Sequence, residues 1–80
     1  MPTNFLLIDT HSNKQKIVFE FIRNYAEITE THIVEGLYDI IVKLEHKNID
    51  QLATIAEKIQ KRIKTNENVL NVKRLICVER

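Results

Sequence analysis

The sequence predicts an α+β fold in which two helices cover one face of a four-stranded antiparallel sheet. Apolar patterns along the 80 residues follow the order strand, helix, strand, strand, helix, strand. Such a βαββαβ series closes most simply as a ferredoxin-like sheet with right-handed crossovers. The only glycine, Gly36, lies between two apolar, β-branched runs. This position indicates a hairpin between the second and third strands, because glycine reaches the positive φ values of tight turns without a steric cost.

The first strand and the first helix are distinguished by their apolar period. Residues 4–9 form a short apolar run that ends in a polar cluster, as expected of a strand. Ser12 is expected to cap the following helix, with Gln15 as its capping-box partner. That helix is predicted from about residue 13 to residue 25, because its apolar residues recur at steps of three and four. They are Ile17, Val18, Phe21, Ile22 and Tyr25.

The hairpin strands are predicted at residues 28–34 and 38–45. Asp39 is unusual in this segment, because aspartate is a poor strand residue and yet it opens the most apolar strand of the chain. We therefore expect its carboxylate to hold a fixed place at the mouth of the hairpin.

The second helix is predicted to begin near Ile49, with Asn48 as its N-cap and Asp50 in its first turn. Basic residues gather at its C-terminal end, where the helix dipole favours them. Its apolar stripe consists of Leu52, Ile55, Ala56, Ile59 and Ile63. Residues 65–68 are predicted to form a turn, and residues 69–78 the last strand.

The two strands expected at the centre of the sheet, the first and the third, are apolar on both faces. In the first strand Phe5 and Leu7 alternate with Leu6 and Ile8. Strand residues alternate sides, so two helices cover only one of these sets. The other set, with Ile41, needs a second cover, and a symmetric homodimer is the commonest one. The last strand contributes either Leu75 and Cys77 or Ile76 and Val78 to this face.

Composition limits the class of protein. The chain is expected to form one small domain over residues 1–80. Its 12 basic and 11 acidic residues give a net charge of +1 and alternate along the chain, so no nucleic-acid-binding face is expected. The lone Cys77 excludes an internal disulfide and fits a reducing cytosol. The sequence has no signal-peptide pattern and no apolar segment of membrane-spanning length, so we expect a cytoplasmic protein with no membrane partner.

The sequence contains no motif that indicates catalysis or a cofactor. His11, His32 and His46 lack the spacing of a metal site, and no glycine-rich phosphate loop is present. No nucleophile and base are paired in a motif, so an enzyme is not expected. An RNA-recognition motif would need exposed aromatic residues on the central strands, and a metal chaperone would need a CxxC pair in the first loop. Both patterns are missing.

The hairpin segment carries a resemblance to a known family. Residues 34–43, Val-Glu-Gly-Leu-Tyr-Asp-Ile-Ile-Val-Lys, resemble the valine/threonine-glycine-x-tyrosine-aspartate-apolar segment of the RAM domain. This domain is the effector-binding half of Lrp/AsnC transcriptional regulators, and the resemblance extends from the first strand to the last. Those regulators carry a helix-turn-helix before the domain, whereas Met1 here lies just ahead of the first strand. The chain therefore resembles a stand-alone RAM domain.

The resemblance implies a ligand site at the hairpin. In the family, small ligands, usually amino acids, lie between dimers where the hairpin turn faces a neighbouring subunit. Carried over, Gly36 would let the backbone approach the ligand, and N–H groups near Leu37 and Tyr38 would bind a carboxylate. Asp39 would accept hydrogen bonds from an α-ammonium group. His32 and Val34 would line the pocket.

Two alternatives remain open for this site. Gly36 only makes the turn and Asp39 only caps the hairpin backbone in the first alternative. The second arises at Arg74, which stands where family members often place small hydroxyl residues. Arg74 either binds a ligand carboxylate or pairs with an acid such as Asp39 and blocks the pocket.

The resemblance implies an amino-acid-sensing and oligomerisation module that regulates transcription through partner proteins. Its expected partners are a second copy, further copies in rings of dimers, full-length Lrp/AsnC regulators and a small-molecule effector. It would not bind DNA directly. The alternative is a purely structural oligomerisation protein with no small-molecule ligand.

Overall fold

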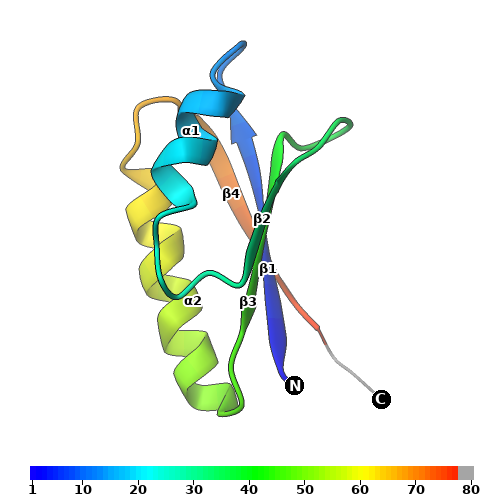
Figure 1. The fold of residues 1–80 in the computed structure, drawn as a ribbon, viewed down its shortest axis with the longest axis vertical. Helices are drawn as coiled ribbons and strands as arrows, with labels where there is room; N and C mark the ends of the chain where they lie inside the picture. Colours follow the sequence, from blue (N-terminus) through cyan, green and yellow to red (C-terminus); the bar gives the residue numbers. More distant parts are fainter. Residues whose placement is uncertain (78–80) are drawn as a thin grey trace.

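The structure is a computed structural model that describes residues 1–77, and it has the predicted order of elements (Figure 1). The sheet order is β2-β3-β1-β4, and all neighbouring strands are antiparallel. The prediction of a ferredoxin-like βαββαβ fold with the first and third strands at the centre is confirmed. The elements are β1 Thr3–Thr10, α1 Gln15–Ile22, β2 Glu30–Ile33, β3 Ile40–Glu45, α2 Ile49–Lys64 and β4 Val69–Ile76.

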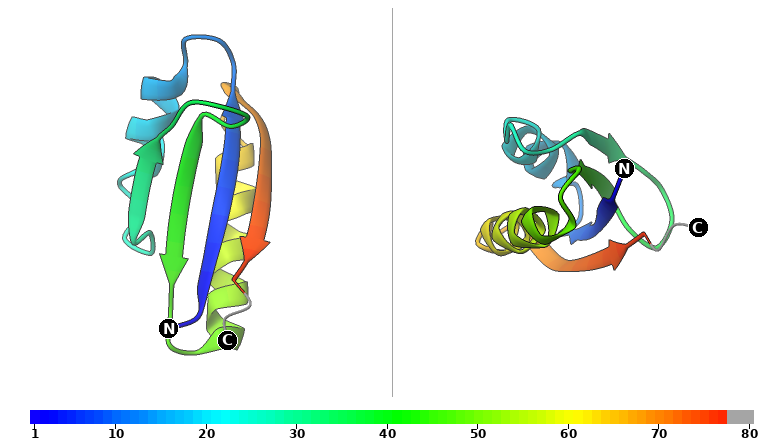
Figure 2. Two further views of the ribbon diagram at one scale, coloured as in Figure 1. Left: turned by 90° about the vertical axis from the view of Figure 1, so that its right-hand side faces the viewer. Right: turned by 90° about the horizontal axis from the view of Figure 1, so that it is seen from below.

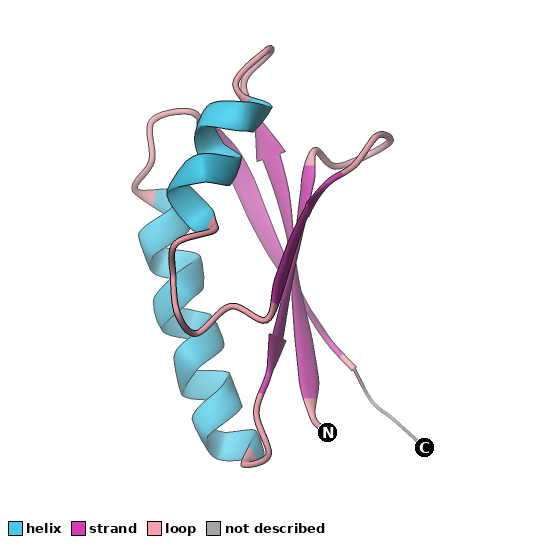
Figure 3. Cartoon of the chain, in the orientation of Figure 1, coloured by secondary structure: helices cyan, strands magenta, loops and turns pink. Residues whose placement is uncertain are grey.

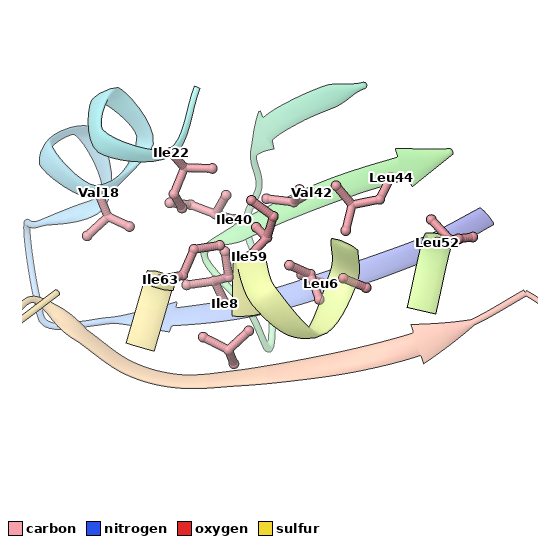
Figure 4. Packing of buried hydrophobic residues seen from close by; sticks show 12 residues of the cluster. Leu6, Ile8, Val18, Ile22, Ile40, Val42, Leu44, Leu52, Ile59 and Ile63 are labelled. Atoms are coloured by element: carbon pink, nitrogen blue, oxygen red, sulfur yellow. The ribbon is translucent and has the colours of Figure 1, made fainter. Parts of the chain in front are cut away.

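Both helices lie on one face of the sheet (Figures 1 and 3). Alternate residues of β1 are buried beneath them, including Leu6 and Ile8, while Phe5 and Leu7 between them are only half-buried. This alternation is the period of two that a strand imposes on its side chains. Figure 4 shows β1, β3 and both helices contributing to the apolar cluster. The cluster contains Leu6, Ile8, Val18, Ile22, Ile40, Val42, Leu44, Leu52, Ala56, Ile59, Ile63 and Val72.

The second helix forms as the sequence predicts. Asn48 is its N-cap, and the Asn48 side chain accepts a hydrogen bond of 2.9 Å from the N–H of Gln51. Asp50 lies in the first turn and three basic residues lie in the last turn, where the dipole favours each sign. Four residues of the predicted stripe are buried against the sheet, and each of the three large side chains contributes about 1.5–3 kcal/mol by burial. They are Leu52, Ala56, Ile59 and Ile63.

The first helix is shorter than predicted, and the Ser12 cap is wrong. Lys14 precedes the helix, and no side chain caps it. Asn13 has a φ of 65°, a left-handed conformation that asparagine tolerates better than most residues, so the chain is still turning after Ser12. At the other end, the Asn24 side chain donates to the Glu20 carbonyl at 3.1 Å. That carbonyl would accept the backbone N–H of residue 24 in a continuing helix, so the competing bond accompanies an end at Ile22.

The strands of the hairpin and the last strand are also shorter than predicted. The β2 strand begins two residues later and ends one residue earlier than predicted, and β3 begins two residues later. The end of β2 and the start of β3 are shortened where the chain between them leaves the sheet (Figure 2). The last strand ends at Ile76, and Val78 lies outside the described residues.

Register decides which residues share the face opposite the helices, called here the open face. Leu75 lies opposite Phe5, whereas Ile76 lies opposite Asn4, which is buried on the helix side. The open face therefore carries Leu75, the first of the two predicted alternatives. Its apolar residues are Phe5, Leu7, Ile41 and Leu75.

Among the described residues, no helix has the length and apolar character needed to cross a bilayer.

Candidate functional site

The hairpin loop, residues 34–39, connects β2 to β3 and is closed by a hydrogen bond. The Val34 N–H donates to the Asp39 carbonyl at 2.9 Å. Gly36 has a φ of 131°, in the region that side-chain-bearing residues rarely adopt. A Cβ built on Gly36 would meet no atom within 4 Å. The glycine is therefore required by backbone conformation and not by a close neighbour.

The hairpin loop bends away from the helices and out of the sheet. In Figure 1 the loop projects on the side opposite the helices, and the left view of Figure 2 shows it crossing in front of β1. Leu37 is 90% exposed in this loop, whereas Tyr38 is half-buried. The loop therefore presents the exposed Leu37 side chain above one end of the open face (Figure 2).

Asp39 occupies a fixed place at the mouth of the hairpin, as predicted. Its backbone N–H donates to the Ile8 carbonyl at 2.9 Å. Its carboxylate oxygen Oδ2 accepts hydrogen bonds from the N–H of Thr10 at 2.8 Å and from the Thr10 hydroxyl at 3.2 Å. Charge-assisted bonds of this length are among the stronger ones in proteins.

Thr10 is the residue of this arrangement that sequence reasoning missed. It lies at the end of β1 and is only 7% exposed. The signal was present, because strand alternation places Thr10 on the same side as Leu6 and Ile8. A polar residue on that side needs a hydrogen-bond partner, and Asp39 is the acidic residue nearest the mouth of the hairpin.

His32 lies on the open face beside the hairpin, within a small group of charges. Its Nε2 is 2.9 Å from Oε1 of Glu30, and Lys43 Nζ is 3.7 Å from the other Glu30 oxygen. The hydrogen bond from His32 and the positive charge of Lys43 lower the pKa of the Glu30 carboxyl below its ordinary value. The group is completed by Glu45, 3.5 Å from Lys43. Val34 lies two residues after His32, where β2 has ended.

Arg74 lies away from the other candidate residues. It is paired with Leu6 in the ladder, on the helix side of the sheet, and its guanidinium makes a long contact of 3.5 Å with the Ala53 carbonyl of α2. Asp39 is bonded to Thr10 instead. The alternative in which Arg74 pairs with Asp39 and blocks the pocket is therefore not the arrangement of this chain.

Residues 1–77 offer neither a metal site nor a pocket of unpaired cations. Within residues 1–77, no group of three histidine, cysteine, aspartate or glutamate residues is placed to hold a metal ion. A shallow depression of about 410 Å³ lies along α2, and its cations already have partners. Lys58 is paired with Glu27 at 3.5 Å and Lys61 with Glu57 at 3.7 Å. Arg62 lies over the ring of Tyr25.

The chain is similar to known proteins in sequence and in fold. The family model described as "Lrp/AsnC ligand binding domain" matches residues 3–80. No curated protein matches the chain.

Solved structures are similar over nearly the whole chain. FFRP-DM1 is 27% identical with a TM-score of 0.77, and the match covers 98% of this chain and 100% of that one. E. coli AsnC is 21% identical with a TM-score of 0.75, covering 99% of this chain and 52% of AsnC. The Neisseria meningitidis transcriptional regulator NMB0573, solved as a complex with L-Met, is 9% identical with a TM-score of 0.73, covering 98% and 50%. The last two show similarity of fold alone.

Proposed function

Because this chain belongs to the Lrp/AsnC ligand binding domain family, we propose that it senses a small molecule, and that this effector is an amino acid. We propose that it regulates transcription through partner proteins. The family is a regulatory, non-enzymatic domain whose members are dimeric and bind small-molecule effectors. The exposed hairpin loop carries this proposal, because it holds the family's glycine-x-tyrosine-aspartate segment above an open sheet face.

An amino acid is the effector that the hairpin loop suits best. The loop offers backbone N–H groups at Leu37 and Tyr38 for a carboxylate. Asp39 offers its second carboxylate oxygen to an ammonium group, since Oδ2 is bonded to Thr10. His32 and Val34 complete the proposed lining next to Gly36. The L-Met complex of the similarly folded NMB0573 supports an effector of this class.

A second copy of the chain is the proposed cover of the open face. Four apolar side chains from β1, β3 and β4 lie there without a helix above them. Face-to-face packing of two sheets would bury them, with alternate residues of each strand interdigitating.

We further propose that dimers associate into rings, that full-length Lrp/AsnC regulators are partners and that the protein acts in the cytoplasm. Association with such a regulator is tested by co-elution of the two purified proteins.

Isothermal titration against the twenty amino acids tests the proposed effector. We expect saturable heat with one amino acid or a small group of related ones. A Glu35→Gln variant should bind as the unaltered chain does, because Glu35 is an exposed acid of the same loop and is not one of the proposed ligand contacts. The absence of heat with all twenty amino acids would contradict an amino-acid effector.

One observation favours the purely structural alternative. Leu37 is almost fully exposed at the loop, as a side chain that docks on a neighbouring subunit would be. In that case Tyr38→Ala should change the assembly state seen by light scattering, while no amino acid changes it. Assembly that responds to an amino acid would exclude this alternative.

A further inference from the structure

Asp39 joins three segments at the point where the hairpin loop leaves the sheet. Its N–H is bonded to β1 through the Ile8 carbonyl, and its carbonyl accepts the Val34 N–H at the end of β2. Its carboxylate is bonded to Thr10, at the end of β1. This residue therefore fixes the start of β3 to both neighbouring strands at once.

The carboxylate replaces an acceptor that the sheet gives up. The β1–β3 register pairs Ile8 with Ile40 and ends there. If the ladder continued, the same register would place Tyr38 opposite Thr10. Instead, the hairpin loop turns away ahead of β3 and crosses in front of β1 (Figure 2). The buried Thr10 N–H would then lack a partner, which is costly for a backbone donor, and Oδ2 of Asp39 supplies one.

We propose that Asp39 is a positioning residue: its carboxylate, bound to Thr10, holds the hairpin loop over the open face independently of any effector. Both Thr10 bonds converge on the single oxygen Oδ2. The positioning role therefore needs one hydrogen-bond acceptor and not a negative charge. It rests on the proposed function only in that the loop it holds is the proposed effector site; the placement itself is a property of the free chain.

An asparagine at position 39 separates positioning from recognition of an ammonium group. Asn retains an acceptor oxygen at nearly the same place but carries no charge. Asp39→Asn is therefore expected to keep the loop in place, whereas Asp39→Ala removes the acceptor and releases it. Thr10→Val is a milder variant, because it removes the hydroxyl donor and leaves the shorter bond from the N–H.

Residue-resolved hydrogen exchange on the protein without any added amino acid tests the proposal. In Asp39→Ala we expect the Thr10 and Val34 amides to exchange about 10- to 100-fold faster, the range that follows when a buried backbone N–H is left without its acceptor. In Asp39→Asn we expect rates within about threefold of the unaltered chain. Thr10→Val should lie between these two at Val34. The control Glu35→Ala, which removes an exposed acid of the same loop, should leave both amides unchanged.

Two results would overturn the positioning role. One is unchanged exchange in Asp39→Ala, and the other is exchange in Asp39→Asn as fast as in Asp39→Ala, which would make the charge itself necessary. Titration of the same variants with amino acids separates this question from the proposed function. If the unaltered chain binds none, the proposed effector fails while the exchange result still decides the positioning role. If Asp39→Asn keeps slow exchange, positioning is supported whether or not an amino acid still binds.

Discussion

At the scale of single residues, polar groups in the core are the most informative. Asn4 is 4% exposed, on the helix side of β1, and its side-chain oxygen has no hydrogen-bond partner among the described residues. The Thr10 hydroxyl, on the same side, donates a hydrogen bond to the Asp39 carboxylate. The two residues share a strand face, but only Asn4 is expected to lower the stability of the fold, because burial of an unpaired polar atom opposes folding.

We therefore expect Asn4→Val to stabilise the protein. Valine removes the unpaired oxygen and suits a strand, so the free energy of unfolding should rise by about 1 kcal/mol. Urea unfolding at a fixed protein concentration measures the change. Asn4→Thr is the control, because threonine is close to valine in size but keeps a polar atom. Its free energy of unfolding should rise less. A loss of stability in Asn4→Val would show that the Asn4 side chain has a polar role in the folded protein.

Glu30 gives a second prediction at this scale. The hydrogen bond from His32, followed by the charge of Lys43, holds the pKa of the Glu30 carboxyl below its ordinary value of 4.5. A carboxyl with a lowered pKa in the folded state stabilises above its unfolded pKa. This contribution is lost as pH falls through the folded pKa, so the window lies below about pH 4.5.

His32→Ala should therefore raise the pKa of Glu30 toward that ordinary value, measured by NMR titration of the carboxyl group. His46→Ala is the matched control, because His46 contacts Asn48 and not Glu30. A Glu30 pKa that does not move in His32→Ala would mean that Lys43 alone is responsible for the lowering.

At the scale of elements, the two helices illustrate how much a cap determines. The α2 helix has its predicted cap and begins at the predicted residue, whereas α1 has no side-chain cap and is shorter than its apolar pattern suggested. The apolar period fixes which face of a helix is buried, but the ends depend on where orphan backbone groups find partners. In α1 the Asn24 side chain donates to the Glu20 carbonyl near the C-terminal end, and no side chain caps the N-terminal end.

Asn48→Ala should lower the free energy of unfolding by about 1 kcal/mol, because the Gln51 N–H loses its acceptor. Thermal or urea unfolding measures it. Asn48→Asp should retain most of the stability, since aspartate caps as well as asparagine. Equal losses in the two variants would show that some feature of Asn48 other than capping is responsible.

At the scale of the whole molecule, the open face governs assembly. Leu7 lies at its centre, beside Ile41 of β3 and Lys73 of β4, and is only half-buried in one chain. If a second copy covers this face, a charge at position 7 would be buried against the partner's apolar residues, which is unfavourable.

Leu7→Lys should therefore shift the protein from dimer to monomer at micromolar concentration, measured by sedimentation velocity. Ile17→Lys is the control for sheet-face dimerisation, because Ile17 is exposed on α1, on the side of the sheet away from the open face (Figure 1). Circular dichroism of both variants verifies that the fold is kept. An unaltered chain that sediments as a monomer at the same concentration would contradict the proposed dimer.

The candidate site was predictable in part from the chain alone. The hairpin, the turn at Gly36 and the fixed place of Asp39 follow from one glycine between two β-branched runs and one acid at the start of an apolar strand. The partner of Asp39 was not predicted, and Arg74 was expected nearer to the hairpin than it lies. Both points depend on register across strands that are distant in sequence, which local periodicity does not encode.

By itself, the sequence determined the order of the elements, the two central strands and the presence of a second apolar sheet face. It did so because apolar periods of two and of three to four residues are local properties of the chain. Only the tertiary structure decided that Leu75 and not Ile76 belongs to the open face, that α1 ends at Ile22, and that Thr10 receives the carboxylate of Asp39. These outcomes required strands far apart in sequence to meet in one register, so that each buried polar group took the partner that packing brought within reach.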